Sequence, residues 1–112
     1  MEVTLVGAST PRQMPMNAAT TSTAGVTTGN GIYKDSLYCV FQLISAAAAT
    51  AIIEGSLDNV NWYFITGASA TSTLTLAGAG TIALVEPVAS AWRFVRCRTT
   101  AATAATTCLM GV

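Results

Sequence analysis

The sequence predicts an all-β fold, a single antiparallel β-sandwich or jelly roll that is preceded by an extended N-terminal arm. Apolar and polar residues alternate with a period of two in several short runs, which is the pattern of half-buried strands. Turn-forming residues separate these runs at short intervals, as they do in sandwiches and small barrels. No helical pattern of useful length interrupts them, and a chain of 112 residues is sufficient for one domain.

Residues 1–31 are expected to form the arm, and residues 32–112 the sandwich. Two prolines within residues 7–16 exclude a helix and favour extended chain. Residues 17–31 are mostly small or polar and have little to bury, so alone they cannot offset the entropy lost on ordering. Such an arm is either disordered or laid along a neighbouring protein, and its spaced apolar anchors favour the neighbour. The candidate partner-binding residues are Val3, Leu5, Arg12, Met14 and Met16.

The first half of the body reads as a strand, a link and a hairpin. Residues 36–44 alternate, and one face of this strand is expected to carry Leu37, Cys39, Phe41 and Leu43. The alanine run that follows is too short to nucleate a helix and is interpreted as a link. Residues 51–57 form the next predicted strand, Asp58 to Asn61 supply turn chemistry, and residues 62–66 return as its partner.

The second half continues in the same pattern. Residues 67–70 are expected to form a loop, and a glycine pair at 78 and 80 a turn. Residues 99–107 form a second link rich in alanine and threonine. Four further segments are predicted strands, and they are residues 71–77, 81–85, 91–100 and 108–110.

The balance of charge favours a protein that associates with other proteins. Charged residues make up only 9% of the chain and the net charge is zero, whereas about 25% is usual for soluble domains. A surface with so little charge gives weak protection against association, so we expect a subunit that packs against copies of itself and other subunits. Neutrality argues against a nucleic-acid partner. The sequence also lacks a long apolar run for a membrane span and the pattern of a signal peptide.

The three cysteines are Cys39, Cys97 and Cys108. All fall in apolar strand patterns, where a free cysteine behaves as a small hydrophobic residue. We therefore expect reduced core residues in a protein made in a reducing cytoplasm. A bridge between Cys39 and Cys97 is the alternative.

The sequence contains little that indicates catalysis. We expect that the protein is not an enzyme and that it binds neither a cofactor nor a metal. The chain has no histidine, so the usual base of a nucleophilic triad and histidine metal sites are both missing. Glu54 and Asp58 could form a carboxylate pair, but aspartate at the start of a turn usually caps its own backbone. Glu54 is interpreted as an exposed strand residue or an arginine partner. A calcium site at Asp58, Asn59 and Asn61 is a weaker alternative, because other ligands of a calcium loop are missing.

Arginines and aromatic residues share the strand at 91–100. Arg96 and Arg98 fall on one face together with Trp92 and Phe94. Such a face can stack nucleic-acid bases, but we favour cation–π contacts and ion pairs with Glu54 or Glu86. Trp62, Tyr63 and Trp92 could line a platform for a sugar, although such residues more often form the core of a small sandwich.

Two phrases carry a resemblance to a known group of proteins. Gly55-Ser-Leu-Asp-Asn-Val-Asn-Trp62, followed by Ala91-Trp-Arg-Phe-Val-Arg96, resembles a "GSxDGxxW" hairpin and an "aRyvR" strand of small β-sandwich proteins in tailed-phage virions. The resemblance covers roughly residues 36–100. The same phrases occur in some discoidin-like, sugar-binding sandwiches. Asn59 and Val60 replace the usual turn glycine, which leaves the turn type open.

The resemblance implies a structural role in a bacteriophage. Size and an N-terminal arm are similar to those of capsid decoration, or cement, proteins, which form homotrimers over the head and bind the major capsid protein. The implied location is the virion surface of the phage head, after synthesis in the host cytoplasm. No membrane, nucleic acid or small-molecule substrate is implied. The alternatives are a structural protein of the phage neck, tail or fibre, and a carbohydrate-binding module.

Overall fold

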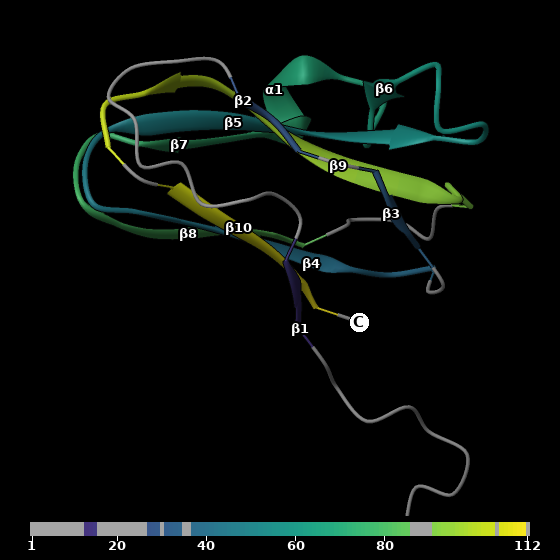
Figure 1. Cartoon of the computed structure of the whole chain (residues 1–112), viewed down its shortest axis with the longest axis horizontal. Coiled ribbons are helices and arrows are strands. Elements are labelled where there is room, and N and C mark those ends of the chain that lie inside the picture. The colour runs from purple at the N-terminus through teal and green to yellow at the C-terminus, as the bar shows by residue number, and fades with distance from the viewer. Residues whose placement is uncertain are drawn as a thin grey trace, which may run out of the picture.

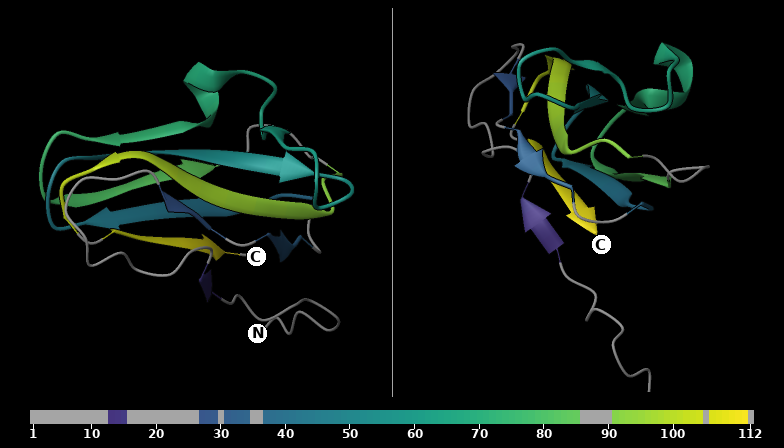
Figure 2. Two further views of the ribbon diagram at one scale, coloured as in Figure 1. Left: turned by 45° about the horizontal axis from the view of Figure 1, so that its top comes forward. Right: turned by 90° about the vertical axis from the view of Figure 1, so that its right-hand side faces the viewer.

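The computed structural model describes residues 13–15, 27–29, 31–34, 37–85, 91–104 and 106–111. Within these ranges, ten strands and one short helix form two antiparallel sheets that lie face to face (Figure 1). Figure 2 shows the same two layers from two further directions. The predicted all-β sandwich is confirmed.

The first sheet has four strands, and the second is built around two long ones. The order in the first is β1 (Gln13–Pro15), β10 (Thr106–Gly111), β4 (Val40–Ser45) and β8 (Gly80–Val85). At the centre of the second, β9 (Phe94–Ala102) pairs with β5 (Ala49–Ser56). Along the outer side of β9 lie β2 (Thr27–Thr28) and β3 (Ile32–Tyr33), and along β5 lie β6 (Tyr63–Phe64) and β7 (Thr73–Leu76). The connections β4–β5, β7–β8 and β9–β10 all cross between the layers at one end, on the left in Figure 1.

The core lies between the sheets and follows the alternation of the strands. In β4, Phe41 and Leu43 are fully buried while Val40 and Ile44 are exposed, because successive side chains point to opposite faces. From the second sheet, Ile53, Val95 and Cys97 meet them. The other buried apolar residues are Cys39, Ala49, Ala51, Ile65, Leu74, Ala102, Cys108 and Met110.

All three cysteines are buried and form no disulfide, as expected. A hydrogen bond with Cys97, followed by burial, raises the pKa of the Cys108 thiol above its ordinary value. These residues therefore fill the core as small apolar groups, and the alternative bridge between Cys39 and Cys97 does not form.

The predicted position of Leu37, on the face of Phe41 and Leu43, is wrong, and the strand predicted at 51–57 ends one residue earlier. Leu37 is 57% exposed and Leu57 is 61% exposed, although each continues the alternation of a neighbouring strand. The reason is that β4 begins at Val40 and β5 ends at Ser56, so the pleat that orients side chains does not reach either leucine.

Other boundaries also differ from the prediction. The strand expected at 62–66 is reduced to β6, Tyr63–Phe64. The expected loop at 67–70 runs into a four-residue helix, α1 (Ser69–Ser72). The predicted link at 99–107 is shorter, because β9 continues to Ala102 and β10 starts at Thr106.

Parts of the predicted arm pair with the sandwich. β1 adds to the edge of the first sheet, where Met14 lies opposite Met110. β2 pairs with β9 in the second sheet. The division at residue 31 stays a prediction, and Val3, Leu5, Arg12 and Met16 lie outside the described residues.

Candidate functional site

A hairpin turn after β5 sets the position of the site. The Ser56 hydroxyl accepts hydrogen bonds from the backbone N–H groups of Asp58 (3.2 Å) and Asn59 (2.9 Å). Asp58 Oδ1 accepts bonds from the N–H groups of Val60 (2.9 Å) and Asn61 (2.8 Å). Asn59 adopts a φ of 60°, a left-handed conformation that asparagine tolerates. The predicted turn is confirmed, and it returns the chain toward β5.

The Asp58 carboxylate is fully engaged in that turn. Besides the two backbone bonds, Oδ1 accepts a bond from the Ser56 hydroxyl, and Oδ2 accepts one from the Asn61 amide at 2.7 Å. The N–H of Asn61, followed by that of Val60, holds the pKa of Asp58 well below its usual range. Both oxygens therefore stabilise the turn, as the capping interpretation predicted. Among the described residues, no group of three histidine, cysteine or acidic side chains could hold a metal ion.

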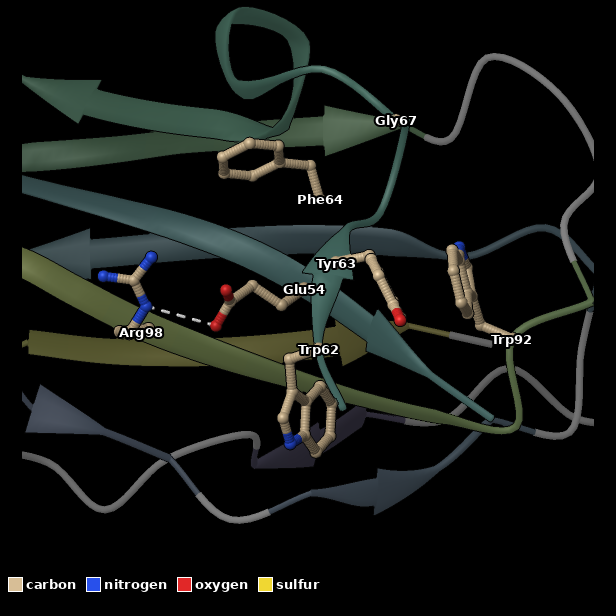
Figure 3. Close-up of a pocket in the computed structure, with 7 residues that line it drawn as sticks. All are labelled: Glu54, Trp62, Tyr63, Phe64, Gly67, Trp92 and Arg98. Carbon is tan, nitrogen blue, oxygen red and sulfur yellow. Dashed lines mark hydrogen bonds and ion pairs between the residues drawn. The ribbon is translucent and has the colours of Figure 1, made fainter. Parts of the chain in front are cut away.

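β6 brings aromatic side chains to both sides of the edge of the second sheet. In the antiparallel register, Phe64 lies opposite Glu54 and Tyr63 lies opposite Gly55. Because alternate residues point to opposite faces, Trp62 and Phe64 lie on the side of Glu54, as Figure 3 shows. Tyr63 points the other way, toward Trp92.

Glu54 anchors a cluster of charges on the outer face of this sheet. Its Oε1 accepts bonds from Arg96 Nε at 2.9 Å and from Arg98 Nε at 3.2 Å. Arg96 lies directly across from Glu54 on β9, and Arg98 is two residues further along. The predicted ion pairs with Glu54 are confirmed. The expectation of an exposed Glu54 is wrong, because the residue is only 7% exposed beneath its two partners.

The ring contact of Arg96 involves Trp62, and not Trp92 or Phe94, which were predicted to share its strand face. Its guanidinium carbon lies 4.3 Å from the centre of the Trp62 ring, which β6 brings across β5. The predicted kind of contact, a cation–π pair, is thus present. Trp92 lies before β9 begins, so it does not follow the alternation of that strand.

Trp92 is held in place on the opposite side of β6. Its indole N–H donates to the Ile65 carbonyl at 3.0 Å, and its ring stacks on Tyr63 with centroids 5.9 Å apart. Gly55 makes room for it, since a Cβ there would lie only 2.5 Å from Trp92 Cγ. Tyr63 itself remains 58% exposed.

These groups line an open cavity of about 440 Å³ at the β6 edge (Figure 3). The size is within the range of small-molecule sites, roughly 300–1,000 Å³. The lining combines aromatic rings with one carboxylate and one guanidinium, and its members are Glu54, Trp62, Tyr63, Phe64, Gly67, Trp92 and Arg98. All three residues of the predicted sugar platform are among them. Phe64 and Gly67 were not predicted, because only the β5–β6 register reveals their position.

A second surface feature is the outer face of the four-stranded sheet. The register places Val40, Gln42 and Ile44 in the middle strand of three, beside outward-facing residues of β10 and β8. Val40 is 43% exposed and Ile44 is 37% exposed. The described side chains of this face include no charged group, and they are Val40, Gln42, Ile44, Thr81, Ala83, Thr107 and Leu109. We call this surface the neutral face.

No helix in the described part of the chain is long and apolar enough to cross a membrane. No family model matches the sequence, and no curated protein matches it.

Two solved structures share the fold. The SPBc2 prophage-derived protein YomS superposes with a TM-score of 0.66 at 12% sequence identity, covering 96% of this chain and 97% of that one. The PBSX exported protein XepA superposes with a TM-score of 0.65 at 17% identity, covering 90% of this chain. The match spans only 36% of the length of XepA. At these identities the likeness establishes a common fold.

Proposed function

We propose that the protein is a structural subunit of a tailed-phage virion, a capsid decoration protein that packs against neighbouring subunits through the neutral face. The observation that carries the proposal is the chemistry of that face. Val40 and Ile44 are exposed side by side with neutral residues of two flanking strands. A flat surface without charge can be buried without the desolvation cost that an unpaired charge would add.

The fold comparison supports a phage setting for this role. YomS, which is named as prophage-derived, matches this chain over nearly the whole length of both proteins. XepA, named as an exported protein of PBSX, contains the fold as part of a longer chain. The low charge of the whole sequence is consistent with a protein that works in an assembly.

The proposed mechanism is weak attachment repeated many times. Burial of apolar surface contributes roughly 25 cal/mol per Å², so one modest contact adds a few kcal/mol before the cost of association is counted. Self-association into a homotrimer would multiply such contacts, because each copy bound raises the effective concentration of the next. The major capsid protein is the proposed partner.

The N-terminal segment is proposed to extend the contact surface. β1 forms one edge of the sheet that carries the neutral face. Val3, Leu5, Arg12, Met14 and Met16 remain the proposed partner contacts. An edge strand of this kind is suited to β-augmentation by another chain.

Counting copies per particle tests the proposal. Particles induced from a host that carries the encoding phage are purified, and the protein is quantified against the major capsid protein by mass spectrometry. Hundreds of copies per particle support a head decoration protein. A dozen or fewer indicate a neck, tail or fibre protein instead, and absence from purified particles refutes a virion role.

A pair of lysine variants tests the proposed surface. Ile44→Lys places a charge at the centre of the neutral face, whereas Val60→Lys places one at the turn, where Val60 is 74% exposed. The first variant should be depleted from particles and should sediment as a smaller species than the wild-type protein. The second should behave like the wild-type protein. Equal incorporation of both variants would show that the neutral face is not the contact surface.

A further inference from the structure

The cavity at β6 has features that the structural role does not require. Both tryptophans of the chain line it, together with Tyr63 and Phe64. Partly exposed aromatic rings at a cavity offer flat apolar surfaces to a ligand. When other contacts already hold the rings in one orientation, ligand binding costs little further side-chain entropy. Here Trp62 is fixed by Arg96, and Tyr63 by the stacked Trp92. The aromatic walls are therefore ordered before any ligand arrives.

The charged groups at the cavity are also ordered. Glu54 pairs with two arginines, Arg98 in the lining and Arg96 behind it, so the cluster of three carries one excess positive charge. Arg98 lines the cavity and uses its Nε for Glu54, and Figure 3 shows its two terminal nitrogens on the side away from that bond. A guanidinium in this position is suited to a ligand carboxylate, since charge-assisted hydrogen bonds are about twice as strong as neutral ones.

We propose that this cavity binds a saccharide that carries an acidic group, such as a uronic acid. A pyranose ring presents an apolar C–H face, which fits the ring of Phe64 on the side of Glu54, and a rim of hydroxyl groups. The buried Glu54 supplies a hydrogen-bond acceptor at the cavity, and Arg98 supplies donors for the acidic substituent. A nucleic acid fits less well, because it is bound through many phosphate contacts and this cluster has one excess positive charge. The inference goes beyond the proposed structural function and does not depend on it.

A matched pair of ligands tests the acidic preference. Methyl glucuronoside and methyl glucoside differ by the carboxylate at C6, and both can be titrated into the full-length protein. Because both tryptophans line the cavity, intrinsic fluorescence reports on this site, and amide chemical shifts map the bound residues without any variant. We expect the glucuronoside to bind about tenfold more tightly, with shifts centred on β6 and β9.

Three variants separate the roles of the lining residues. Arg98→Gln should reduce the preference for the glucuronoside over the glucoside to about onefold. Phe64→Ala should weaken both ligands about tenfold and keeps both tryptophans as reporters. Tyr33→Ala is the matched control, because Tyr33 is an exposed aromatic residue of β3 in the same sheet and does not line the cavity.

Several results would overturn the inference. If neither sugar changes the fluorescence or the chemical shifts, a saccharide site is excluded. Equal affinity for the two sugars would exclude the role of Arg98. Acetate or benzoate binding as tightly as the glucuronoside would show a site for simple or aromatic carboxylates. Chemical shift changes away from β6 would place binding elsewhere. None of these outcomes depends on copies per particle, so this inference and the proposed function can fail separately.

Discussion

Gly55 offers a sharp test of how the cavity is built, because its lack of a side chain is what admits Trp92. A Cβ at this position would lie 2.5, 2.6 and 2.8 Å from three atoms of the indole ring, Cγ, Cδ2 and Cδ1. Favourable contacts between carbon atoms lie near 3.5–4.0 Å. Gly55→Ala therefore requires the indole ring, or β5 itself, to move by about 1 Å.

The ring cannot move by that amount without losing other contacts. The bond from Trp92 Nε1 to the Ile65 carbonyl, 3.0 Å long, would be stretched or broken, and the stack on Tyr63 would be disturbed. Overpacking costs roughly 1–3 kcal/mol, and a lost hydrogen bond about 1 kcal/mol. Replacing glycine with alanine in a strand returns about 0.5–1 kcal/mol of chain entropy. The expected net loss of unfolding free energy is about 2 kcal/mol.

Urea denaturation followed by tryptophan fluorescence measures this loss. With a slope of about 2 kcal/mol per M, the midpoint of Gly55→Ala should fall by about 1 M. The control is the same substitution in a Trp92→Leu background, where the smaller side chain leaves room for the new methyl group. There the alanine should cost much less, which gives a coupling energy of about 1–2 kcal/mol in a double-mutant cycle. An equal cost in both backgrounds would refute the argument that Gly55 exists to accommodate Trp92.

Three further predictions concern the turn, the thiols and the core. The hydrogen bonds that lower the pKa of Asp58 stabilise the folded state above the ordinary carboxyl pKa of 3.8, and this stability is lost progressively as the pH falls below 3.8. The urea midpoint should therefore drop more steeply between pH 5 and pH 2 in the wild-type protein than in Asp58→Ala. Identical pH profiles of the two proteins would contradict this prediction. Because all three cysteines are buried thiols outside any disulfide, a thiol reagent should modify none in the native protein and all three in urea. Rapid modification of the native protein would show that the core opens readily. Leu43→Ala removes a fully buried side chain of β4 and should lower the unfolding free energy by about 2–5 kcal/mol, measured against Gln42→Ala on the outer side of the same strand, which should cost far less.

The alternation of single strands could be predicted from the sequence, because the period of two is a local property of extended chain. Phe41 and Leu43 of β4, and Cys39 just before it, are buried as the alternation predicts. The turn at Asp58 was equally local, since a short side chain bonds the backbone two and three residues ahead. The ends of the strands could not be predicted in this way, and for that reason Leu37 was placed on the face of Phe41 and Leu43 although it is exposed.

The cavity depends on register, which a single sequence does not specify. Complementary charge alone was enough to predict an arginine partner for Glu54. The burial of Glu54 could not be predicted in this way, because it follows from two arginines of β9 that bond the same carboxylate oxygen. Phe64 lines the cavity because β6 pairs with β5 at one particular offset, and a shift of one residue would turn it to the opposite side. The helix α1 could not be predicted from the sequence, because its four residues, Ser-Ala-Thr-Ser, are too few to show a helical period of apolar residues.

The two outer faces of the sandwich differ in chemistry, and this difference bears on how the two proposals relate. Nearly all the charge that the structure describes on the sheets lies with Glu54, Arg96 and Arg98 on the second sheet, whereas the neutral face belongs to the first. A β-sandwich separates its outer faces by the thickness of two layers, roughly 10 Å between sheets. A subunit attached through the neutral face would therefore present its cavity away from the surface to which it is bound. On a phage head that orientation exposes the cavity to the surroundings of the particle, where a weak saccharide site gains avidity from the many copies carried by one shell.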